Sequence, residues 1–69
     1  MKIHLEEYRK RRKLNQAQLA KISGVPQPMI SMIETGDVPN PTIKTLYRLA
    51  GALKCTVDDL IEDEAERGA

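Results

Sequence analysis

Apolar residues recur at intervals of three and four along most of the chain, which is the spacing that places them on one face of an α-helix. The clearest case follows Thr42, where the recurring apolar residues are Ile43, Leu46, Leu49, Ala50 and Leu53. No alternation of apolar and polar residues is long enough to indicate a β-strand. The pattern therefore predicts an all-α fold.

Signals that begin and end helices divide the chain into five expected helices, at about residues 3–12, 15–24, 27–35, 42–53 and 56–61. Asn15 is a suitable N-cap, and Gln18 three residues later completes a capping box. Gly24 and Gly36 end the second and third helices. Lys13 ends the first helix, at a position where glycine is easier because the backbone there is often left-handed.

The composition limits the protein to one small domain with an aliphatic core. The 69 residues are enough for a domain at residues 1–61 and an acidic tail at 62–69, and they include no Trp or Phe. A lone Cys55 forms neither an intramolecular disulfide nor a structural zinc site. No apolar run reaches the roughly 20 residues of a membrane span, and no secretory signal follows Met1. We expect a cytoplasmic protein without metal, cofactor or membrane contact.

The net charge of +1 hides an asymmetry between the two ends of the chain. Residues 1–21 hold seven Lys or Arg against two Glu, whereas residues 56–69 hold six Asp or Glu against one Arg. A basic amino-terminal part suits an anionic partner, although such a run is often only a solvated face. Catalysis is not expected, because the chain has one His, one Cys and no glycine-rich loop that would cradle phosphate.

The most informative stretch is residues 16–35, QAQLAKISGVPQPMISMIET. It joins two short helices through a turn in which Gly24 is the permissive residue. Ala20 is small enough for the second of these helices to cross closely, and Val25 with Ile30 and Ile33 anchors that helix on the core. The other side of this second helix is then left free for a ligand, as in a helix-turn-helix.

With these residues in place, the chain resembles the phage-repressor (Cro/CI, or XRE) family of helix-turn-helix DNA-binding proteins. The resemblance covers roughly residues 5–61 and includes LNQAQLA, SGV, PTIKTLYRLA and TVDDLI, with Ile30, Ser31, Ile33, Glu34 and Gly36. It implies a five-helix, lambda-repressor-like domain that places its third helix in the major groove of double-stranded DNA. The positions that match the family's base-reading residues are Gln27, Pro28, Ser31 and Met32.

The resemblance also implies contacts beside the groove. Gln16 matches the family's phosphate-contacting glutamine at the start of the second helix, and we expect further contacts to the DNA backbone from Asn15, Lys13 and Lys21. Arg9 and Glu34 match a structural salt bridge that ties the first helix to the third.

Several residues depart from the family pattern. Pro26 replaces the usual Ser or Thr N-cap, and the loop after Gly36 has Asp37 where cations are common. Lys13 and Lys54 stand where glycine is frequent. Pro28 and Met32 replace polar or basic readers; with Met29 they form an apolar patch that suits either thymine methyl groups or a protein partner.

We expect a sequence-specific transcriptional regulator that represses by covering a promoter and acts as a homodimer on a two-fold symmetric site. The expected dimer interface is Leu53, Leu60 and Ile61, and packing of these residues in the monomer core is the alternative. The competing function is a protein-interaction module, such as the antitoxin of a toxin–antitoxin pair. Antitoxins of this family also bind DNA, so the two functions are compatible.

Overall fold

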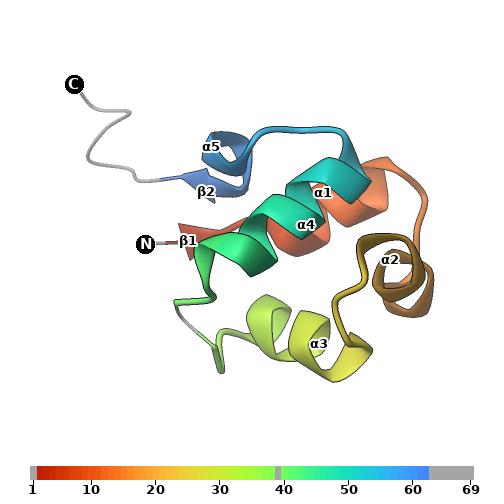
Figure 1. The fold of residues 1–69 in the computed structure, drawn as a ribbon, viewed down its shortest axis with the longest axis horizontal. Helices are drawn as coiled ribbons and strands as arrows, with labels where there is room; N and C mark the ends of the chain where they lie inside the picture. Colours follow the sequence, from red (N-terminus) through yellow and green to blue (C-terminus); the bar gives the residue numbers. More distant parts are fainter. Residues whose placement is uncertain (1, 39, 63–69) are drawn as a thin grey trace.

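The computed structural model describes residues 2–38 and 40–62, and it has the expected all-α, five-helix architecture (Figure 1). The helices are α1 (Leu5–Arg11), α2 (Gln16–Ser23), α3 (Gln27–Thr35), α4 (Ile43–Leu53) and α5 (Val57–Leu60). Among the described residues no helix is long and apolar enough to cross a membrane.

A two-residue antiparallel ladder adds to the helices. Strand β1 (Lys2–Ile3) pairs with β2 (Ile61–Glu62), so that Ile3 lies opposite Ile61. The prediction that helices include Ile3 and Ile61 is therefore wrong. The ladder is too short to leave an alternating pattern in the sequence, and it joins the two ends of the domain, which no local signal reveals. Of the expected acidic tail at 62–69, residues 63–69 lie outside the described part of the chain.

The helix ends follow the local signals. The Asn15 side-chain oxygen accepts a hydrogen bond of 2.7 Å from the Gln18 N–H, and the Gln18 side chain returns one of 2.8 Å to the Asn15 N–H. Gly24 ends α2 with φ at +77°, which a residue without Cβ adopts freely. Lys13 and Lys54 also have positive φ, at 57° and 54°, which confirms that they occupy left-handed turns. The capping box thus defines where α2 begins, and the left-handed residue Gly24 lies in the turn between α2 and α3.

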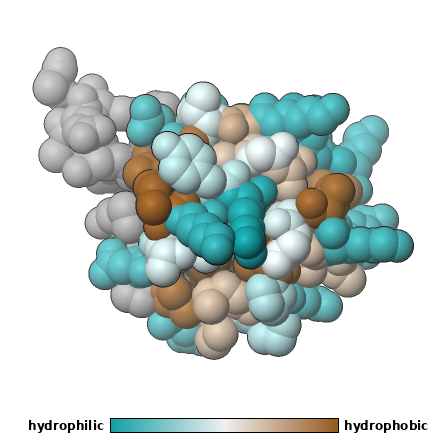
Figure 2. Space-filling model, in the orientation of Figure 1, coloured by the Kyte–Doolittle hydropathy of each residue, from teal (hydrophilic) through white to brown (hydrophobic). Residues whose placement is uncertain are grey.

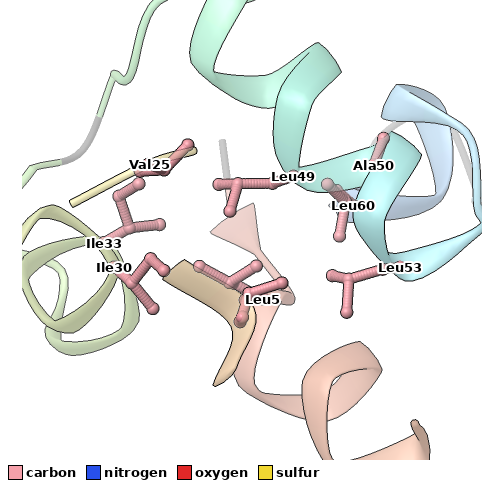
Figure 3. Packing of buried hydrophobic residues seen from close by; sticks show 9 residues of the cluster. Leu5, Val25, Ile30, Ile33, Leu49, Ala50, Leu53 and Leu60 are labelled. Atoms are coloured by element: carbon pink, nitrogen blue, oxygen red, sulfur yellow. The ribbon is translucent and has the colours of Figure 1, made fainter. Parts of the chain in front are cut away.

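The core between the helices is aliphatic, as expected, and Figure 3 shows side chains from α1, α3, α4 and α5 converging in it. Among the described residues, those buried in this core cluster are Leu5, Leu19, Val25, Ile30, Ile33, Leu49, Ala50, Leu53 and Leu60. Tyr8 packs against the cluster while partly exposed.

This packing corrects the expected dimer interface. Leu53 is 1% exposed and Leu60 0% exposed, so neither side chain has surface left for a second copy. Ile61 is partly buried and belongs to β2. The alternative is therefore right for Leu53 and Leu60: both belong to the monomer core. An apolar residue on the inner side of a helix looks the same in the sequence whether it packs in a core or in an interface, so the pattern alone does not separate the two.

Candidate nucleic-acid interface

Helix α3 has one side in the core and the other in solvent. Ile30 and Ile33 are buried, whereas Gln27, Pro28 and Met32 are exposed. Of the four expected base-reading residues, only Ser31 is partly covered. The structure thus brings the four together on or beside the outer surface of one helix, with the three exposed residues available to a ligand.

The first turn of α3 needs no capping side chain, which explains how Pro26 replaces a Ser or Thr. The Pro26 carbonyl accepts hydrogen bonds from the N–H groups of Met29, at 3.0 Å, and Ile30, at 3.1 Å. Pro28 has no N–H to satisfy. Fewer free N–H groups also mean a weaker attraction for phosphate at this end of α3, which leaves recognition to its side chains.

Arg9 links α1 to α3 through a bidentate ion pair with Glu34. Its Nε donates to Glu34 Oε2 at 2.8 Å and its Nη2 donates to Glu34 Oε1 at 3.0 Å. A third nitrogen, Nη1, donates to the Leu14 carbonyl at 2.8 Å. The two side chains are 12% and 3% exposed, so the pair is largely withdrawn from water. The expected salt bridge is present, and it sets the position of α3 relative to α1.

Gln16 joins the same cluster, which sequence reasoning missed. Its Nε2 donates to Glu34 Oε1 at 3.1 Å, across 18 positions of the chain. An amide nitrogen carries two hydrogens, so the second remains available to a phosphate oxygen. The internal bond is therefore compatible with the expected DNA contact.

The pKa of Glu34 is lowered even though burial alone would raise it. Hydrogen bonds from Arg9 and Gln16 and the charge of Arg9 together outweigh the loss of solvent. The same pair raises the pKa of Arg9. Glu34 therefore remains ionised in the folded protein to a lower pH than in the unfolded chain.

Because Glu34 has a lower pKa in the folded state, we expect the protein to lose stability as the pH falls below the ordinary value of 4.5. Above that value the contribution is complete; it disappears as the pH passes through the lowered pKa. Urea midpoints at a series of pH values measure the effect. Asp59→Asn is a useful control, because hydrogen bonds from Thr56 also lower the Asp59 pKa. If this variant abolishes the whole acid sensitivity, Glu34 is not its source.

Two of the basic residues before α2 contact other parts of the protein. Arg12 Nε donates to the Leu53 carbonyl at 3.0 Å, and its Nη2 donates to the Lys54 carbonyl at 3.5 Å. Arg11 lies 4.7 Å above the Tyr8 ring. Arg12 is thus a C-terminal cap of α4, a role that sequence reasoning missed because its partners lie 41 and 42 positions away.

The expected DNA-backbone residues do not all lie at one place. Lys13 and Asn15 are exposed immediately before α2, and Gln16 is its first residue. Lys21 is in the last turn of the same helix. The structure therefore groups Lys13, Asn15 and Gln16 at one end of α2 and separates Lys21 from them.

A family model, a protein sequence and a solved structure each match this chain. Residues 5–60 match the model of a helix-turn-helix family. The chain is 28% identical over 72 residues to an uncharacterized HTH-type transcriptional regulator of Rickettsia conorii, an alignment that covers 100% of this chain and 66% of that protein. A solved structure described as a SinR protein/SinI protein complex aligns with a TM-score of 0.83 and 28% identity, over 91% of this chain and 61% of that one. This chain spans less than two thirds of the length of either protein.

Proposed function

Because the chain belongs to the Cro/CI-like helix-turn-helix family of DNA-binding transcriptional regulators, we propose that it binds a specific double-stranded DNA site with α3 in the major groove. The observation that carries this proposal is that Gln27, Pro28 and Met32 are exposed on one helix. The ion pair between Arg9 and Glu34 ties that helix to α1. An α-helix fits the major groove, with its first residues next to the base edges.

The residues of this surface have distinct roles in the proposal. Gln27 reads an adenine through paired hydrogen bonds to N6 and N7. Gln16 donates its second amide hydrogen to a phosphate, with Lys13 and Asn15 beside it. Lys21 contacts phosphate from the other end of α2. Phosphate contacts fix the register of the protein on the duplex, and base contacts select the sequence.

Repression by covering a promoter is the simplest consequence of such binding, in the cytoplasm where the DNA lies. Two copies on one site are part of the proposal, since a single helix-turn-helix of this size makes few base contacts. In a two-fold arrangement the two copies of α3 lie about 34 Å apart and read half-sites about 10 bp apart. The burial of Leu53 and Leu60 means that the copies meet through other side chains.

Selection of bound sequences from random double-stranded DNA tests this function. We expect one enriched sequence composed of two inverted half-sites about 10 bp apart centre to centre. Its affinity should fall as the salt concentration rises, because phosphate contacts release counterions. Selection that enriches no sequence, at low salt and high protein concentration, would contradict sequence-specific binding.

A second candidate function, the binding of a protein partner, is supported by the outer side of α4. Ile43 and Tyr47 lie one turn apart and are 60% and 66% exposed. Figure 2 shows strongly hydrophobic and strongly hydrophilic residues side by side on the face that α4 presents. The similar solved chain is itself described as part of a complex with a second protein. An antitoxin that binds both DNA and a toxin fits both surfaces.

A further inference from the structure

The outer surface of α3 has no charge available to a ligand. Its one charged residue, Glu34, has a side chain that is 3% exposed and is held by Arg9. The exposed residues are Gln27, Pro28, Met32 and Thr35, all of them uncharged. We propose that Pro28 and Met32 read the 5-methyl groups of thymines, so that the half-site is composed of A·T pairs where α3 contacts it; this inference rests on the proposed function.

The groups that each base presents in the major groove explain why an uncharged helix favours A·T pairs. Guanine presents two acceptors, which Arg or Lys recognises best, and cytosine presents a donor that suits Asp or Glu. With Glu34 committed internally, α3 has none of these side chains to offer. Thymine presents a methyl group, which attracts apolar contacts, and adenine suits Gln27. The hydroxyls of Ser31 and Thr35 suit any base pair. Gln27 and the two apolar residues therefore decide the preference, and they favour A·T pairs.

The two apolar residues are placed to meet methyl groups. Pro28 and Met32 are four positions apart on one helix, which makes them neighbours on its surface. The Met32 residue is 37% exposed, whereas Ile30 is 0% and Ile33 is 3% exposed. Met32 therefore lies outside the buried side of α3 that Ile30 and Ile33 form.

The energetic cost of ordering this pair on DNA is small. The Pro28 ring has almost no side-chain entropy to lose on binding. The Met32 carbonyl accepts bonds from Thr35 Oγ1 and the Val38 N–H, both at 3.2 Å, which fix the backbone while the flexible thioether remains free to adapt.

The patch is a poorer match for a protein partner than for DNA. Met29, the residue that would extend it, is partly buried and packs against the core. Two side chains on one turn are a small apolar area compared with the patches that mark protein interfaces. A thymine methyl, in contrast, needs contact with only one or two side chains.

Replacing thymine by uracil removes the methyl group and leaves every hydrogen-bonding group in place. In a selected duplex, we expect each thymine that contacts α3 to lose about fourfold in affinity when replaced by uracil, as expected for one buried methyl group. Met32→Ala should make the duplex insensitive to uracil at one of these positions, and Pro28→Ala at another. Ile22→Ala is the matched control, because Ile22 is 58% exposed on α2, outside α3, and should retain the full uracil effect.

The outcomes separate this inference from the proposed function. If a selected site binds tightly but uracil has no effect at any thymine of the half-site, the methyl-reading inference is wrong while sequence-specific binding stands. A uracil effect that persists unchanged in both Met32→Ala and Pro28→Ala would overturn it as well. If selection finds no site, the proposed function fails first, and this inference fails with it.

Discussion

Replacing Arg9 with alanine is expected to lower the free energy of unfolding by about 3–5 kcal/mol, because it leaves a buried carboxylate without its partner. Glu34 would keep only the bond from Gln16, and the Leu14 carbonyl would lose its donor as well. Small domains are stable by only about 5–15 kcal/mol, so this loss is a large fraction of the total. Urea unfolding followed by far-ultraviolet circular dichroism measures it in a protein that has no Trp.

Two variants separate the buried pair from general effects of removing charge. Arg11→Ala breaks a pair with Glu7 in which both side chains are more than half exposed, and should change stability by less than about 1 kcal/mol. Replacing both partners, as Arg9→Met with Glu34→Leu, should recover much of the loss, because no buried charge remains unpaired. An Arg9→Ala protein that unfolds at the same urea concentration as the wild type would show that the pair does not hold α1 to α3.

The largest effect on DNA binding is expected from Gln27→Ala. Loss of paired hydrogen bonds to one adenine should weaken a selected site by about 1–3 kcal/mol, or roughly 5- to 150-fold, with little change for random duplexes. Fluorescence anisotropy with both kinds of duplex measures the two affinities.

Gln16→Ala is the informative comparison for Gln27→Ala. It would remove the proposed phosphate contact and should therefore weaken selected and random duplexes by the same factor. Equal losses on both duplexes for Gln27→Ala would instead place Gln27 on the DNA backbone.

Local signals in the sequence predicted most of the fold. Helix ends depend on a few neighbouring residues, so the capping box at Asn15 and the left-handed turns at Lys13, Gly24 and Lys54 could be anticipated. The ion pair between Arg9 and Glu34 was predicted from the family resemblance, since nothing local links positions 25 residues apart.

Apart from that ion pair, the features that depend on distant contacts were not predicted. Arg12 belongs to a basic run that looks like a phosphate-binding surface, yet its guanidinium caps α4. Leu60 has the same apolar character in a dimer interface and in a core, and only the packing of α5 decides between them. The pairing of β1 with β2 similarly joins residues from opposite ends of the domain.

The central proposal is that α3 contacts the bases of a specific site and the start of α2 contacts the backbone. The most direct measurement is a titration of the ¹⁵N-labelled protein with a selected duplex, followed by the backbone amide signals. We expect the largest shifts at Gln27, Met29 and Met32 of α3 and at Asn15 and Gln16, with α4 almost unchanged. Shifts concentrated on the outer side of α4, with the α3 signals unchanged, would contradict the proposed interface.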